Sequence, residues 1–206
     1  MKYYMKLGFI LLLIAAIASG VLALLNSYTK PIIEQNKLKT KEEAQKLVLP
    51  HAETFEEKAI AVEKAAVKPD PLKIQKETGG SSKFVYYVGK NSQQQIVGYT
   101  FVAHKYGYSS TIETMVGVKP DLSINKIKII KQAETPGLGA NCESEDFTSR
   151  FKGLTKTNLL VDKDGGQIKS LTGATISTRT ITKSIKTGLQ NIETALKIQN
   201  TKEEAE

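Results

Sequence analysis

Hydroxyl-bearing residues surround one Gly-Ala pair in residues 170–178, and an amphipathic helical pattern follows directly. Backbone amides at a helix start point outward with a partial positive charge, so they stabilise a phosphate group without an arginine. Small residues there let the backbone approach a bulky group. The segment therefore predicts a phosphate-holding turn, although its hydroxyls could instead only cap the helix. The candidate contacts are Thr172, Gly173, Ala174, Thr175 and Ser177.

A second candidate is the loop at residues 134–139, which comes directly after a predicted strand. Its sequence, Glu-Thr-Pro-Gly-Leu-Gly, joins a rigid proline to flexible glycines. It lacks the third glycine and the strand-turn-helix context of a dinucleotide fingerprint, so a Rossmann fold is not favoured. Two interpretations stay open, a tight turn and a loop beside a planar ligand. The second would use Glu134, Thr135, Gly137, Leu138 and Gly139.

Other catalytic and metal-binding patterns are not evident. His51 and His104 are far apart, and neither has a cysteine or histidine at ligand spacing, so no metal site is expected. There is no Gly-x-Ser-x-Gly elbow and no Walker loop. The single cysteine, Cys142, cannot form an intramolecular disulfide, and we expect a small packed side chain.

The charge balance points to a membrane surface rather than to nucleic acid. The net charge is +8, but most of the excess is lysine spread along the chain. Arginine, the usual reader of bases and phosphates, occurs only at Arg150 and Arg179. We therefore expect no nucleic-acid partner and a lysine-rich surface near anionic lipid headgroups.

An apolar segment near the N-terminus is long enough to cross a bilayer. No charged residue lies between Lys6 and Lys30, and the predicted transmembrane anchor is residues 7–25. A cleaved signal peptide is the alternative, but the apolar run continues beyond the small residues that a peptidase would accept. The positive charges of residues 1–6 predict a cytoplasmic N-terminus in the cell inner membrane, with the main domain extracytoplasmic, that is periplasmic.

The remaining chain predicts an α+β fold with a mainly antiparallel sheet packed by helices. Residues 26–50 form a juxtamembrane helix, with Pro31 in its first turn and Pro50 at its end. A connecting segment, 51–82, contains turn signals at 68–71 and 79–82. Four runs of β-branched and aromatic residues with short breaks predict an antiparallel meander. These strands are residues 84–88, 96–103, 111–118 and 124–130.

Two helices are expected around and after the sheet. One begins near Ser144, with Phe147 and Phe151 packed in the core. The last, residues 177–198, has one apolar face that would pack on the sheet, made by Ile181, Ile185, Leu189, Ile192 and Leu196. Residues 162–166 are expected to form a turn, residues 199–206 a polar tail, and the domain would cover residues 83–198.

The anchor, the 134–139 loop and the Thr-Gly-Ala-Thr sequence at 172–175 together resemble the G subunit of the Rnf ion-translocating electron transport complex. Residues 106–108 and 115–118 also resemble its flavin-binding domain. The resemblance implies FMN attached covalently to Thr175 through a phosphoester, installed by a flavin transferase that uses FAD. This sequence departs from the family pattern at Lys169, where an aspartate is usual, and at residues 109–110, which replace a glycine-rich stretch.

The resemblance also implies a role. The chain would be a membrane-anchored electron-transfer subunit of a ferredoxin:NAD oxidoreductase, without a catalytic set of its own. Its partners would be the other subunits, the flavin transferase and membrane lipid. Two alternatives are the C subunit of the sodium-pumping NADH:quinone reductase, which uses a similar threonine, and an anchored scaffold whose hydroxyl cluster only caps a helix.

Overall fold

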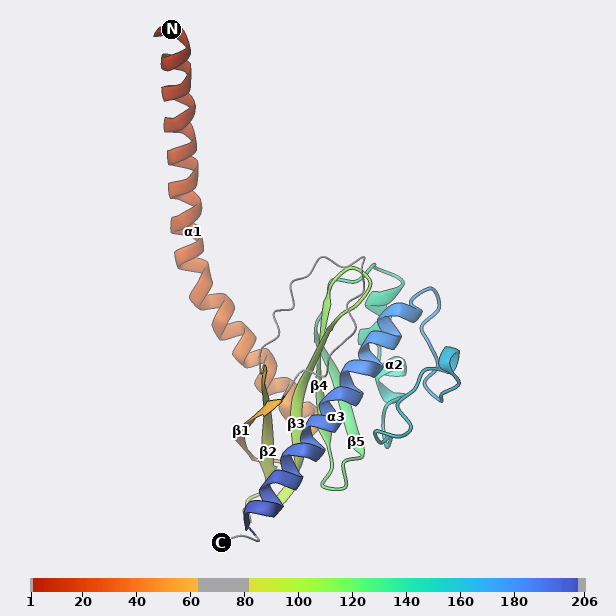
Figure 1. The fold of residues 1–206 in the computed structure, drawn as a ribbon. Helices are drawn as coiled ribbons and strands as arrows, with labels where there is room; N and C mark the ends of the chain where they lie inside the picture. The colour runs from red at the N-terminus through yellow and green to blue at the C-terminus, as the bar shows by residue number, and fades with distance from the viewer. Residues whose placement is uncertain (1, 63–81, 204–206) are drawn as a thin grey trace. The chain divides into compact units, whose positions relative to one another are not determined.

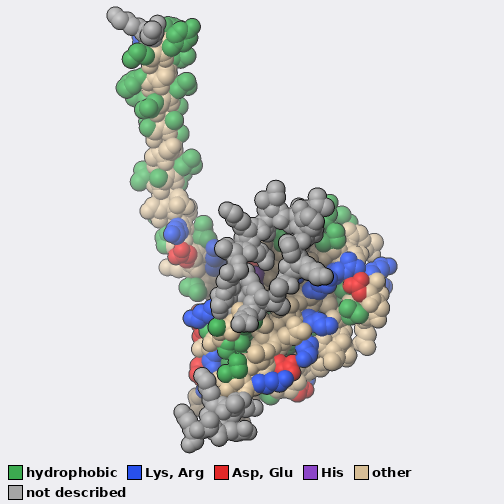
Figure 2. Space-filling view, viewed as in Figure 1, with side chains coloured by type: hydrophobic (Ala, Val, Ile, Leu, Met, Phe, Trp, Pro, Cys, Tyr) green, Lys and Arg blue, Asp and Glu red, His purple; other side chains and the backbone are tan. Residues whose placement is uncertain are grey.

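The computed structural model describes residues 2–62 and 82–203, which divide into two compact units, Met1–Glu42 and Glu43–Glu206 (Figure 1). Helix α1 (Lys2–Val48) provides the whole first unit. By length and composition it can cross a membrane, with a mean hydropathy of 2.7 in its apolar part. Figure 2 shows apolar side chains exposed along it.

Pro31 lies inside α1, so the expectation of a new helix beginning there is wrong. Proline lacks one backbone N–H and clashes with the preceding turn, which costs about 3 kcal/mol. Strong helix formers flank Pro31, including leucines before it and Lys, Glu and Gln after it, and they carry the helix through. The helix ends at Val48, two residues before Pro50, as predicted.

The second unit contains a five-stranded antiparallel sheet in the order β1-β2-β3-β4-β5. The four predicted strands are confirmed as β2 (Ser82–Lys90), β3 (Ile96–Tyr106), β4 (Thr111–Val118) and β5 (Ile124–Lys131). The expectation of four strands misses β1 (Thr54–Val62), which pairs with β2 within the segment predicted as a connection. The predicted turn at 68–71, and residues 79–81 of the next one, lie outside the described residues.

Helix α3 (Thr175–Glu203) packs on one face of the sheet, mainly against β3 (Figure 1). Its predicted apolar face is confirmed: Ile181, Ile185, Leu189 and Ile192 are buried and Leu196 is half-buried. Gly188 allows the close approach, because a Cβ there would lie 1.9 Å from Cε2 of Phe101. The helix continues to Glu203, so the expected tail is helical over 199–203, and residues 204–206 are not described.

Short helices complete this unit beside the sheet and α3. They are η1 (Gly139–Glu143), α2 (Glu145–Ser149) and η2 (Asp162–Asp164). Ser144 caps α2 by accepting a hydrogen bond from the Phe147 amide, which confirms the predicted start. Phe147 and Phe151 meet edge to face in the core, 5.3 Å between ring centroids.

The end of α1 and the residues after it cover the other face of the sheet. Ala44 and Val48 pack against Met115 on β4. The Asn125 side-chain amide donates to the Val48 carbonyl oxygen over 2.7 Å. Gly117 makes room for this approach, since a Cβ there would lie 2.5 Å from the Val48 oxygen. Residues 43–52 are therefore an integral part of the second unit.

Candidate functional site

Among residues 2–62 and 82–203, three backbone amides at the start of α3 have no hydrogen-bond partner. The Thr178 amide donates to the Ala174 carbonyl over 3.1 Å, so Ala174 is the residue that caps the helix. The helix starts at Thr175, two residues before the predicted start. The amides of residues 175–177 therefore have no carbonyl four residues earlier within the helix to bind.

The nearby hydroxyls do not cap these amides. Ala174, at the capping position, has no side-chain oxygen. Thr178 Oγ1 donates to the Ala174 carbonyl over 3.0 Å and accepts from the Leu171 amide over 3.1 Å. Ser177 Oγ donates to Glu134. The interpretation that this Ser/Thr cluster serves only to cap the helix is therefore wrong, because its buried hydroxyls fasten the preceding turn and a distant loop.

Thr175 lies half-buried at this open helix start. Within the part of the chain that the structure describes, its hydroxyl takes part in no hydrogen bond. Thr172 and Gly173 are exposed on the turn before it, whereas Ala174 is buried. The first turn of α3 contains no acidic residue that would repel an anion. An esterifiable hydroxyl and open amides thus share one helix end, which is what a phosphate group requires.

Glu134 joins three separate segments at this site. Its carboxylate accepts the backbone amides of residues 108–110 over 3.0 to 3.1 Å, and the Ser177 hydroxyl over 2.6 Å. The residue is 5% exposed. Burial raises the pKa of Glu134, but the hydrogen bonds from Ser177 and from the three amides outweigh that effect and lower the pKa below its ordinary value. A charged Glu134 thereby holds the β3-β4 hairpin, the 134–139 loop and α3 together.

The two predicted loops meet in the structure. A Cβ on Gly173 would lie 2.9 Å from Cδ2 of Leu138, and Gly173 has a φ of +72°, which glycine adopts without strain. The Thr135 carbonyl oxygen accepts a hydrogen bond from the Leu138 amide over 3.2 Å, so the loop is a tight turn. Gly137 lies in that turn with a φ of +75°. Leu138 nevertheless stays 43% exposed beside the Thr175 turn, as a contact for a ligand would.

Gly139 explains the close approach of the loop to α3. A Cβ there would lie 2.9 Å from Ser177 Oγ and 3.0 Å from Oε2 of Glu134. Glycine therefore leaves room for the hydrogen bond between those two side chains. Gly107 plays the same part on the hairpin, where a Cβ would lie 2.7 Å from Oε1 of Glu134.

Sequence reasoning missed the residues that hold the segment before the turn. Arg150 donates from Nη1 to the Lys169 carbonyl over 2.6 Å. Asp162 accepts the Ser170 amide over 3.1 Å and also its hydroxyl. Arg179 forms a two-pronged pair with Asp164, at 2.8 and 2.7 Å. Both arginines of the chain thus fix loops near Thr175, a role that the sequence did not indicate.

Cys142 is packed as predicted and is not a reactive group. Its side chain is fully buried, and burial raises the pKa of the thiol to about 12. The thiolate that would act as a nucleophile is therefore scarce at neutral pH. Residues 162–166 form η2 and a turn at Gly165, in agreement with the prediction.

Comparison with known proteins matches two families on this chain. Residues 107–190 match the FMN-binding domain, and residues 2–46 match the RnfG N-terminal region. The G subunit of a sodium-translocating ferredoxin:NAD oxidoreductase complex from Acetobacterium woodii is 34% identical over 92% of this chain and 91% of its own. The G subunit of an ion-translocating oxidoreductase complex from Methanosarcina acetivorans is 30% identical, over 83% and 85%.

Solved structures agree on the fold. NqrC from Shewanella oneidensis superposes with a TM-score of 0.54 at 17% identity, over 76% of this chain and 99% of its own. The C subunit of a sodium-translocating NADH-quinone reductase from Parabacteroides distasonis gives 0.52 at 19%, over 75% and 91%. These two structures show that the fold is shared. The G subunits are more similar in sequence, at 30% identity or more over most of the chain. The chain belongs to the family of G subunits of Rnf-type ion-translocating electron transport complexes.

Proposed function

We propose that this chain is the membrane-anchored flavoprotein subunit of a ferredoxin:NAD oxidoreductase of the Rnf type, with FMN joined to Thr175 through a phosphoester. The observation that carries the proposal is the open helix start. Ala174 at the capping position leaves the amides of residues 175–177 available beside the Thr175 hydroxyl. The FMN-binding domain match spans both this turn and the 134–139 loop.

The residues present fit an FMN phosphate. The open amides supply donors and the positive end of the helix dipole, so a phosphate dianion is stabilised there. Gly173, with its exposed backbone, leaves the approach to Thr175 unobstructed. Leu138 offers an apolar surface of the kind that planar ligands contact. When bound, FMN supplies one-electron and two-electron chemistry, and the protein supplies its position and surroundings.

Attachment is a phosphoryl-group transfer without redox change. The Thr175 oxygen forms a bond to the phosphorus of the FMN half of FAD, the bond to the AMP half breaks, and AMP leaves. The hydroxyl proton goes to a base of the flavin transferase. Thr175 acts as an attachment point only, and the chain contributes no catalytic group to the electron transfer itself.

A covalent bond suits a carrier on the outer side of a membrane. A weakly held flavin would be lost by dilution, whereas a tether keeps it at a high effective concentration. Lys2 and Lys6 on the short N-terminal side favour a cytoplasmic N-terminus. The domain would then face outward in the cell inner membrane, beside the other subunits of the complex.

The test is production of the full-length chain in membranes together with the flavin transferase. The wild type should keep its flavin fluorescence on a denaturing gel, and Thr175→Val should lose it completely. Thr187→Val is the matched control, since it removes an exposed hydroxyl further along α3 and outside the turn, and it should stay fluorescent. Fluorescence that survives Thr175→Val, or a peptide mass without FMN on Thr175 in wild type, would overturn the proposal.

A further inference from the structure

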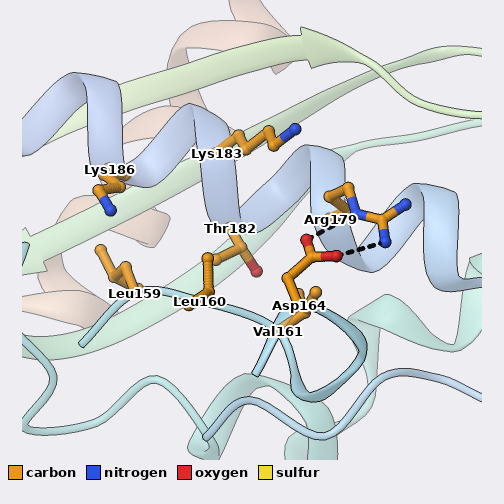
Figure 3. A pocket seen from close by; sticks show the side chains of 8 residues that line it. All are labelled: Leu159, Leu160, Val161, Asp164, Arg179, Thr182, Lys183 and Lys186. Atoms are coloured by element: carbon orange, nitrogen blue, oxygen red, sulfur yellow. Dashed lines mark hydrogen bonds and ion pairs between the residues drawn. The ribbon is translucent and has the colours of Figure 1, made fainter. Parts of the chain in front are cut away.

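A shallow groove lies beside the proposed attachment site, between α3 and the segment 159–164 (Figure 3). Its volume is about 110 Å³. Leucine and valine side chains of the segment form one wall, and polar and basic side chains of α3 form the other. The lining residues are Leu159, Leu160, Val161, Asp164, Arg179, Thr182, Lys183 and Lys186.

The charge of this groove is positive and only partly compensated. Arg179 is held by the carboxylate of Asp164. Lys183 lies near enough to contribute to the lowered pKa of Asp164, but neither Lys183 nor Lys186 forms a salt bridge with any residue among 2–62 and 82–203. Figure 3 shows Lys186 pointing across the groove toward Leu159 and Lys183 extending away from it. Within these ranges, two lysines that form no salt bridge therefore stand beside an apolar wall on which Leu160 is 38% exposed.

The groove and Thr175 lie on one face of α3. Thr175, Arg179, Thr182 and Lys186 follow one another at spacings of four, three and four residues, which places them in a single row. At a rise of about 1.5 Å per residue, Lys183 is only about 12 Å along the axis from Thr175. A protein that engages another typically covers roughly 800 Å² of its surface. A footprint of that size centred on the Thr175 hydroxyl extends to the groove.

We propose that this groove is the docking site for an acidic segment of the flavin transferase, with an apolar side chain against Leu160 and carboxylates at Lys183 and Lys186. The inference rests on the proposed function. Lysines on flexible stems suit carboxylates of a protein segment, whereas Arg179, the rigid fork that would favour a small phosphate, is already occupied by Asp164. Complementary charge of this kind speeds association and raises specificity, so it acts on the encounter and not on the bond-forming step.

The experiment measures the initial rate of flavin attachment to the full-length chain in detergent, with purified transferase and FAD. Lys183→Glu/Lys186→Glu should raise the KM for the carrier roughly tenfold or more and leave kcat unchanged. Lys126→Glu/Lys128→Glu, a matched charge reversal on exposed lysines of β5, should leave both constants at the wild-type values. Raised salt should slow the wild type but speed the charge-reversed variant, because salt screens attraction in the first and repulsion in the second.

Each outcome decides between the possibilities. If the wild type takes no flavin at Thr175, the proposed function itself fails. If the wild type is loaded and the groove variant has an unchanged KM, the docking proposal fails alone. The proposal also fails if attachment is normal and only electron transfer within the intact complex is slowed, because the groove would then serve a neighbouring subunit. Lys183→Gln/Lys186→Gln, which removes charge without reversing it, should give an intermediate KM.

Discussion

The Ser177 hydroxyl donates a hydrogen bond to the Glu134 carboxylate over 2.6 Å, across 43 residues of sequence. Ser177 is in the first turn of α3, two residues after Thr175, and both partners are buried. This bond fixes the helix start to the 134–139 loop. Because the same carboxylate also holds the β3-β4 hairpin, a change at Glu134 reaches the Thr175 turn directly.

Glu134→Gln tests that link. A neutral amide oxygen accepts weaker hydrogen bonds than a carboxylate, and its NH₂ group faces the amides of residues 108–110 or the Ser177 hydroxyl. We expect the free energy of unfolding to fall by about 1 to 3 kcal/mol. Flavin attachment should also slow, which a gel-fluorescence time course would measure. Unchanged stability and unchanged attachment would contradict the linking role.

The pH dependence follows from the lowered pKa of Glu134. Since the folded pKa is below the ordinary value of 4.5, the carboxylate stabilises the fold above that pH, and this contribution is lost as the pH falls through the folded pKa. When the pH is lowered from about 5 to 3, the melting temperature of the wild type should therefore fall further than that of Glu134→Gln.

Gly173→Ala should impair flavin attachment more than it impairs folding. A φ of +72° costs a residue with a Cβ about 1 to 2 kcal/mol, and the new methyl also pushes Leu138. Gly153→Ala is the matched control, because Gly153 has a φ of +76° with no atom within 4 Å of the added Cβ. Thermal melts should show similar losses in both variants, while only Gly173→Ala loses fluorescence. Equal attachment in the two would argue against contact of Leu138 with this turn.

Much of the fold was predictable because one face of each element is buried. In β5, Ile127 and Ile129 are buried while Lys126 and Lys128 are exposed, and this alternation alone predicts the strand. β1 was missed because it is an edge strand, in which Glu56, Glu57 and Lys58 interrupt any apolar pattern. Charged side chains are common on edge strands, but only the structure reveals that β1 lies at the edge of the sheet.

The site was predictable as two pieces but not as one assembly. Sequence indicates a turn around Thr175 and a loop at 134–139, since glycines and hydroxyls mark both. It does not indicate that Glu134 accepts hydrogen bonds from three backbone amides, because every residue except proline has such an amide and the sequence does not mark which ones are used. The roles of Asp162 and Arg150 likewise depend on chain folding that brings residues 8 to 19 positions apart into contact.

Ala174→Ser separates helix capping from phosphate binding. A serine at the capping position would accept one of the open amides of residues 175–177, and such a cap stabilises a protein by about 0.5 to 2 kcal/mol. The flavin-free protein should therefore melt at a higher temperature than wild type. Attachment of flavin to Thr175 should become slower, because the new hydroxyl competes with the phosphate for those amides. Ala174→Gly, which has no hydroxyl, serves as the comparison and should not raise the melting temperature.

We expect the folded domain to begin at residue 43. Residues 43–52 cover the outer face of the sheet, and β1 pairs with β2 along nine residues of register. Removing them would expose Met115, which is fully buried, and would leave β2 as an unpaired edge. Burial of a single valine or methionine side chain contributes about 1.5 to 3 kcal/mol, so this loss is large for a domain of this size.

A fragment of residues 43–206 should therefore be soluble and unfold cooperatively, whereas residues 83–206 should aggregate or melt without a sharp transition. Circular dichroism melts and size-exclusion chromatography of the two fragments would measure this. Gly117→Ala in the longer fragment probes the same contact, because the added Cβ would lie 2.5 Å from the Val48 oxygen and should cost about 1 to 3 kcal/mol. If residues 83–206 melted as sharply and at the same temperature as 43–206, the end of α1 would not belong to the folded domain.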